Sequence, residues 1–145
     1  MEWLAVLEHS ALAQAVATAP HVYPLLSAAH ILGMATLFGA ILTVDLRLMG
    51  MLSELMEPAL PTLTRLALVG FALAAVTGAL LMLPEPVAYL ANPAFQAKMA
   101  LIAASGLLAI TFVRGGVVSR SLAGASSLIL WTLAVIAGRY IAFVP

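Results

Sequence analysis

The sequence predicts an all-α fold: an integral membrane four-helix up-down bundle with a short N-terminal interfacial helix. Of its 145 residues, 64% are hydrophobic and 8% are charged, whereas charged residues make up about a quarter of a typical soluble domain. Four apolar stretches are also long enough to cross about 30 Å of hydrocarbon as helices. We place these spans near residues 23–48, 62–83, 95–113 and 122–143.

Breaks rich in proline or glycine separate the spans: EPALP at 57–61, LPEP at 83–86, NP at 92–93 and RGG at 114–116. Such clusters are typical of turns and loops. Because all three connections are short, neighbouring spans are expected to run antiparallel. The length suits one compact unit, so we treat residues 1–145 as a single membrane domain.

The first 19 residues resemble a signal peptide only in their small-residue ending. A signal peptide starts with positive charge and continues with an unbroken apolar run, whereas this segment carries Glu2 and Glu8. Trp3, Leu4 and Leu7 share one helical stripe, which favours a helix lying in the membrane interface over residues 1–19.

The distribution of arginine predicts the orientation of the bundle. Cytoplasmic loops of membrane proteins are enriched in lysine and arginine. The arginines that flank the first and third connections are Arg47, Arg65, Arg114 and Arg120. We therefore expect a multi-pass protein of a bacterial inner membrane with both termini in the periplasm.

The composition also excludes several classes of function. The chain has no cysteine, which removes disulfides, thiol chemistry and cysteine metal sites. Its formal net charge is zero and it has no basic run, which argues against nucleic-acid binding. No acid lies mid-membrane and no Ser/His/Asp set is visible, so hydrolysis is not expected. An electron carrier or a binding protein is favoured over an independent enzyme.

His30 is an ionisable residue within the first predicted span. It lies about six residues past Pro24, or roughly 9 Å into the membrane. An ionisable residue within a span predicts a ligand or proton site. The alternative is an imidazole that hydrogen-bonds across the bundle and only holds helices together.

Lys98 and Arg139 approach the same depth from two other spans. An imidazole ligand for iron, apolar walls for the porphyrin and cations for the propionates are what a membrane-embedded haem requires. We therefore expect a b-type haem in the outer leaflet, bound through His30 as the metal ligand. The same three groups also suit the headgroup of an anionic lipid or a quinone.

The second axial ligand stays open between four possibilities. His21 folds over the site if Pro24 breaks the helix, and Met34 lies one turn from His30. The iron is otherwise five-coordinate or receives His30 of the partner subunit across a two-fold axis. A homo-oligomer is expected in any case, because the small residues from Ala29 to Thr43 favour close helix contacts and four short spans enclose little space.

Two further groups of residues lie away from His30, one of charged side chains and one of methionines. Asp45 is about 22 Å along the helix from His30, too far to share a metal. We expect it to form an ion-pair girdle at the inner face with Arg47, Arg65 and Arg114. A second group, Met49, Met51 and Met56, offers thioether sulfurs of the kind that bind Cu(I).

Four stretches together form a specific pattern: AHILGMATLFGAILTVDLRLMG, FALAAVTGALLM, NPAFQAKMALI and SLILWTLAVIAGRYIAF. Over most of the chain from about residue 21, it resembles a family of small four-helix bacterial inner-membrane proteins of unknown function. That family is loosely similar to the membrane domain of copper-resistance D-like (CopD-like) proteins. The resemblance implies motif positions at His30, Gly33, Asp45, Arg47, Lys98, Trp131, Gly138 and Arg139.

The resemblance implies little about function. It keeps copper as an alternative, and four-helix b-type cytochromes give the haem hypothesis only an analogy. Such cytochromes carry several intramembrane histidines on two helices, whereas this chain does not, so ligation by two histidines of one subunit is in doubt.

The sequence thus predicts a haem b-binding membrane protein for electron transfer or redox sensing, with a redox partner protein or a quinone as its counterpart. One alternative is a copper-handling membrane protein that uses His30 and Met34. The other is a non-catalytic assembly or lipid-binding component.

Overall fold

The computed structural model describes residues 2–115 and 119–144, and the elements in this part are all helical. They are α1 (Glu2–Glu8), α2 (Ala11–Thr18), α3 (Val22–Leu48), the 3-10 helix η1 (Glu54–Ala59), α4 (Leu60–Leu81), α5 (Pro86–Ala91), α6 (Pro93–Val113) and α7 (Arg120–Tyr140). The stretches containing α3, α4, α6 and α7 are each long and apolar enough to cross a membrane. The predicted all-α fold with four spans is confirmed.

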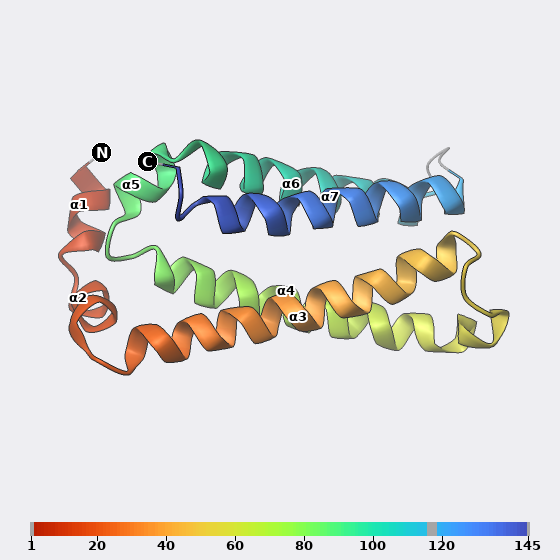
Figure 1. Ribbon diagram of the computed structural model, residues 1–145, viewed down its shortest axis with the longest axis horizontal. Coiled ribbons are helices and arrows are strands. Elements are labelled where there is room, and N and C mark those ends of the chain that lie inside the picture. Colours follow the sequence, from red (N-terminus) through yellow and green to blue (C-terminus); the bar gives the residue numbers. More distant parts are fainter. Residues whose placement is uncertain (1, 116–118, 145) are drawn as a thin grey trace.

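The long helices form two antiparallel pairs, α3 with α4 and α6 with α7 (Figure 1). The pairs meet where the second half of α3 crosses α7. No Cα atom of α4 lies within 8 Å of a Cα atom of α6 along their whole lengths. The bundle is therefore open on the side between α4 and α6.

Two glycines allow α3 and α4 to pack closely. A Cβ atom added to Gly33 would lie 2.8 Å from the backbone nitrogen of Ala74, and one added to Gly70 would lie 2.6 Å from that of Leu37. Small residues at such contacts let helix backbones approach within a membrane, where packing replaces the hydrophobic effect. Gly33, one residue of the predicted small-residue seam of the first span, thus contacts α4.

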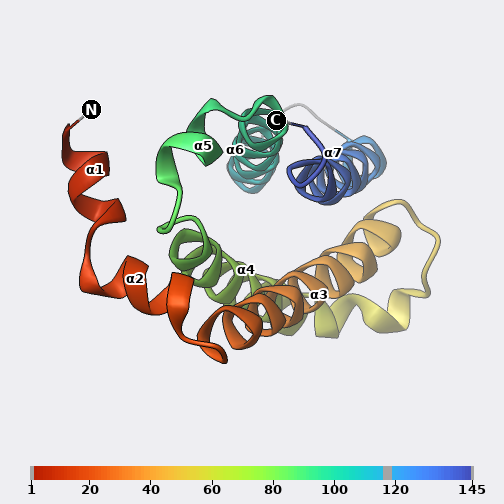
Figure 2. The same cartoon turned by 60° about the vertical axis from the view of Figure 1, so that its left-hand side comes forward.

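The N-terminal segment differs from the expected single helix. The first helix ends at Glu8. Ser10 then caps the start of the second helix, because its side chain accepts a hydrogen bond from the Ala13 amide at 3.1 Å. Of the predicted apolar stripe, Leu4 is buried and Leu7 is exposed, while the Trp3 side chain lies outside the described part. The two helices pack against α5, α3 and α4, beside one end of the bundle (Figure 2).

Both termini lie at one end of the bundle, which we call the terminal end (Figure 1). The connections after α3 and after α6 lie at the opposite end. We call this the arginine end, because it carries Arg47, Arg65, Arg114 and Arg120.

The ion pairs at the arginine end are not those that the sequence predicted. Glu57 of η1 binds Arg47 at 3.0 Å and Arg120 at 2.8 Å, which joins the ends of α3 and α7. Asp45 is only 3% exposed, and among the described residues none of Asp45, Arg65 and Arg114 forms an ion pair. The prediction of a girdle built on Asp45 is wrong, because Asp45 is enclosed at the crossing of α3 and α7, where a Cβ on Gly124 would lie 2.7 Å from its carbonyl oxygen.

Candidate functional site

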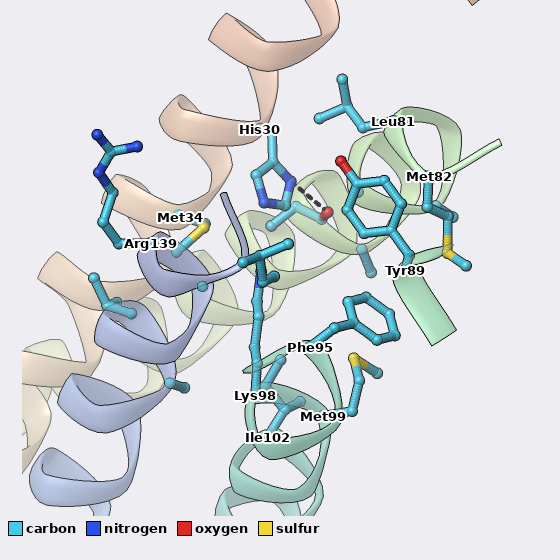
Figure 3. A pocket seen from close by; sticks show the side chains of 18 of the residues that line it. His30, Met34, Leu81, Met82, Tyr89, Phe95, Lys98, Met99, Ile102 and Arg139 are labelled. Carbon is cyan, nitrogen blue, oxygen red and sulfur yellow. Dashed lines mark hydrogen bonds between the residues drawn. The ribbon is translucent and has the colours of Figure 1, made fainter. Parts of the chain in front are cut away.

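A cavity of about 660 Å³ lies at the terminal end, between α3, α4, α5, α6 and α7. We call it the histidine cavity, because His30 lines it from α3 (Figure 3). Most of its lining is apolar and includes Leu37, Phe71 and Ile102. Its volume is within the range of ligand and cofactor pockets. The cavity exists because α4 and α6 do not contact each other.

The His30 imidazole is held in place by α4. Its Nδ1 atom lies 2.9 Å from the carbonyl oxygen of Ala74 and 3.1 Å from the hydroxyl oxygen of Thr77. The carbonyl can only accept, and the Thr77 hydroxyl donates its own proton to the Leu73 carbonyl at 2.6 Å. The network therefore assigns the proton to Nδ1. In the neutral ring, Nε2 keeps its lone pair and is available to a ligand.

A glycine on α4 provides the space for this ring. A Cβ atom on Gly78 would lie 3.0 Å from Cε1 of His30 and 3.4 Å from Nδ1. The ring is thus packed against bare backbone, next to the carbonyl that binds it. A larger residue at position 78 would move the imidazole.

Lys98 lies across from His30 and is supported by a second glycine. Its aliphatic stem and Nζ pass over Gly138 of α7, where an added Cβ would be 3.4 Å from Nζ. Figure 3 shows Lys98 rising from α6 towards His30. Both residues line the histidine cavity. The structure therefore brings together the predicted imidazole and one predicted cation.

Arg139 lines the same cavity but does not converge with them. Its guanidinium carbon lies 4.8 Å from the centroid of the Phe143 ring, a cation–π contact. In Figure 3 the side chain extends away from His30 and Lys98. The expected pair of cations above the histidine is thus reduced to Lys98.

Of the two residues predicted as a second axial ligand, only one lines the histidine cavity. Met34 lines the cavity, whereas His21 is exposed before α3 and does not line it. Met34 follows His30 by one helical turn, so both side chains approach from the same side. Met34 would therefore approach a group held by His30 from the α3 side, whereas His21 lies outside the lining of the cavity.

Sequence reasoning missed several polar and sulfur-containing residues of the cavity. The additional lining residues of these kinds are Tyr23, Met82, Glu85, Tyr89, Asn92 and Met99. Burial, and then the neighbouring Tyr23 hydroxyl, raise the pKa of Tyr89, so its phenol stays protonated at neutral pH. Glu85 belongs to LPEP, a stretch whose prolines indicate a turn. No periodic signal in the sequence connects this turn with His30.

The described residues contain no cluster of three or more histidine, cysteine or acidic side chains that could enclose a metal ion. A metal at His30 would therefore need further ligands that are not histidine, cysteine or acidic side chains. Porphyrin nitrogens are such ligands, and methionine sulfur is another.

The fold and the cavity define a small multi-pass membrane protein with an imidazole in a laterally open apolar site. The chain matches no protein-family model, no curated protein and no solved structure. The resemblance described above therefore stays a prediction, and the functional argument rests on the cavity itself.

Proposed function

We propose that the protein binds a b-type haem in the histidine cavity, with Nε2 of His30 as an axial ligand, and serves electron transfer or redox sensing. The observation that carries the proposal is the bond between Nδ1 of His30 and the Ala74 carbonyl, 2.9 Å long. Histidines that bind metals commonly donate their other ring N–H to a carbonyl or carboxylate, which fixes the tautomer and the ring orientation.

The other residues of the cavity also suit this group. The apolar walls fit a macrocycle, and Gly78 gives the imidazole a fixed position between α3 and α4. Lys98 carries the positive charge that a propionate requires. When bound, the haem supplies an iron that changes its oxidation state by one electron.

The residues of the chain position the ligand, exclude water and adjust the local charge. Ala74 and Thr77 hold the His30 ring, and the apolar lining excludes water from the ligand. Lys98 adds a positive charge that favours the state carrying one more electron. Together these groups set the affinity and the redox potential of the site.

The copper alternative has less support. Met34, Met82 and Met99 line the cavity with His30, but Figure 3 draws Met34 and Met82 on opposite sides of it. The other predicted thioethers begin at Met49, roughly 28 Å along the chain from His30 at 1.5 Å per helical residue. They lie at the arginine end and cannot complete a site at His30.

The non-catalytic alternative uses the same hydrogen bonds. An imidazole that bonds to Ala74 and Thr77 also joins α3 to α4 without any ligand. Two experiments distinguish haem binding from a purely structural role of His30. They are absorption spectroscopy of the purified protein and a haemin titration of the apoprotein in mild detergent. We expect a Soret band and saturable haem binding. A protein that carries no haem and does not bind haemin contradicts the proposal.

We further propose that the terminal end faces the periplasm of a bacterial inner membrane. The support is that all four arginines of the first and third connections lie at the opposite end. Reporter fusions to the C-terminus test this orientation. A cytoplasmic C-terminus contradicts it and reverses the leaflet of the histidine cavity.

A homo-oligomer also belongs to the proposal, because the side between α4 and α6 is open at the terminal end and a second copy there would give the cofactor a further wall. Native mass spectrometry from mild detergent is expected to show more than one subunit. Monomers that retain the cofactor contradict it. A redox partner protein or a quinone would exchange electrons with the site.

A further inference from the structure

A second cavity of about 660 Å³ lies at the arginine end, and the haem proposal does not use it. We call it the arginine-end cavity. Phe71 of α4 and Trp131 of α7 line both cavities, and their rings meet edge to face with centroids 6.4 Å apart. The rings bridge the gap between the helix pairs and mark the boundary between the two cavities.

The arginine-end cavity reaches the lateral surface between α4 and α6. Leu68 of α4 and Val113 of α6 line it, yet they are 63% and 83% exposed. Gly106 of α6 also lines it, and a Cβ atom there would meet no atom within 4 Å. In a membrane, this side of the bundle faces lipid, so lipid chains have direct access to the cavity.

The walls of this cavity on the α4–α6 side suit an acyl chain better than water, whereas the polar side chains of Asp45 and Ser127 line its far side, on α3 and α7. Its lining is mainly aliphatic and aromatic. The hydroxyls of Thr64 and Ser105 donate to the carbonyls of Leu60 and Leu101 in their own helices, so neither presents a free donor. Buried water requires several polar partners, whereas an apolar space open to lipid gains dispersion contacts when chains fill it.

Four arginines and three acids lie at this end, and two of the arginines are unpaired among the described residues. Arg65 follows the lining residue Thr64 directly, and Arg114 follows Val113. Both arginines are exposed, and no described side chain forms an ion pair with either. Arg120 lines the cavity and pairs with Glu57.

The acids near this cavity do not cancel that charge. Glu57 is already shared between Arg47 and Arg120. Asp45 is the only acid among the lining residues, and it is enclosed beneath Gly124 at the crossing of α3 and α7. Glu54 in η1 is the one further acid at this end, so the two unpaired arginines still leave an excess of positive charge on the described part of the rim.

We propose that the arginine-end cavity binds an anionic phospholipid of the surrounding membrane, with an acyl chain between α4 and α6 and the phosphate at Arg65 and Arg114. Basic pockets between membrane helices are a known mode of recognition for anionic headgroups. The lipid closes the arginine-end part of the open side of the bundle. The proposal does not depend on haem binding at the other end.

The test is native mass spectrometry of delipidated protein titrated with phosphatidylglycerol or with phosphatidylcholine of the same chains. We expect phosphatidylglycerol to bind more tightly, and the double variant Arg65→Gln/Arg114→Gln to lose roughly tenfold or more of that affinity. Arg139→Gln is the control, because it removes the same charge at the terminal end. Equal binding of the two lipids, or an equal effect of the control, overturns the proposal.

A second pair of variants tests the acyl-chain site. Gly106→Leu places a side chain in the cavity without meeting another atom at Cβ, and it should weaken phosphatidylglycerol binding several-fold. Gly39→Leu is the matched control, since a Cβ on Gly39 of α3 also meets nothing within 4 Å and the residue lines neither cavity. Helicity of each variant is checked by circular dichroism, and the arginine variants decide the outcome if Gly106→Leu does not fold. Unchanged lipid binding in a folded Gly106→Leu protein, or its conversion from dimer to monomer with lipid retained, overturns the proposal in favour of a contact between copies.

Discussion

Nδ1 of His30 on α3 donates a hydrogen bond to the carbonyl oxygen of Ala74 on α4, 2.9 Å away. That carbonyl belongs to a helix that packs against α3 through Gly33 and Gly70. The close approach of the two backbones thus determines which ring nitrogen carries the proton. The remaining nitrogen is the one that a ligand in the histidine cavity would meet.

Gly78→Ala is expected to weaken haem binding without removing the ligand. Its Cβ would be 3.0 Å from Cε1 of His30, so the ring must move and Nε2 must move with it. Haemin titration should show a several-fold loss of affinity with unchanged helicity. Gly39→Ala, at a site with no neighbours, is the control. Identical affinities for the two variants contradict the role assigned to Gly78.

Lys98→Met is expected to lower the midpoint potential of bound haem, because the lost positive charge stabilised the reduced state. Arg139→Met should shift it less, since that guanidinium lies over Phe143 and extends away from His30. Spectroelectrochemical titration measures both values. Equal shifts, or an upward shift in Lys98→Met, would show that Lys98 is not the cation beside the cofactor.

Asn92→Ala should destabilise the terminal end by about 2 kcal/mol. Its side-chain oxygen accepts from the amides of Ala94 and Phe95, and its nitrogen donates to the carbonyls of Ile141 and Val144. Asn92→Asp keeps the acceptor and loses the donor, so it should recover part of the loss. Thermal unfolding of both variants tests this, and equal stabilities contradict it.

Gly70→Ala is expected to cost roughly 1–3 kcal/mol, because its Cβ would meet backbone atoms of Leu37 and Gly33 that cannot move independently. Gly39→Ala should instead leave stability unchanged or raise it by up to about 1 kcal/mol, as alanine favours helix. Unfolding in detergent mixtures measures the difference. A Gly70→Ala protein as stable as wild type would mean that α3 and α4 are not packed as described.

The spans were predictable because their signals are local. The first was placed at 23–48 and is Val22–Leu48, and the third was placed at 95–113 and is Pro93–Val113. Hydropathy gives the length of a span, and residues such as Pro93 and Asn92 mark its beginning. The short helix α5 and the break at Ser10 were missed, because segments of six to eight residues carry too little periodicity.

The site was predicted less completely, because its assembly depends on contacts between helices. His30 and Lys98 were found as ionisable residues at equal depth, and the structure brings them to one cavity. Ala74 bonds through its backbone, and Gly78 acts by lacking a side chain, so neither has a signal in the sequence. Glu57 was not assigned to Arg47, because the position of η1 depends on how α3 and α7 cross.

The central claim is that Nε2 of His30 is an axial ligand of haem. The most direct measurement is the haem-to-protein ratio and absorption spectrum of wild type, His30→Ala and Thr77→Val, each reconstituted with haemin in mild detergent. Thr77→Val is the control, because it alters the interhelical bonding of the same imidazole and leaves the Ala74 carbonyl and Nε2 in place. We predict that wild type and Thr77→Val bind haem and that His30→Ala does not. A His30→Ala protein with a full haem complement and an unchanged spectrum, or a wild type that binds no haem, would contradict the claim.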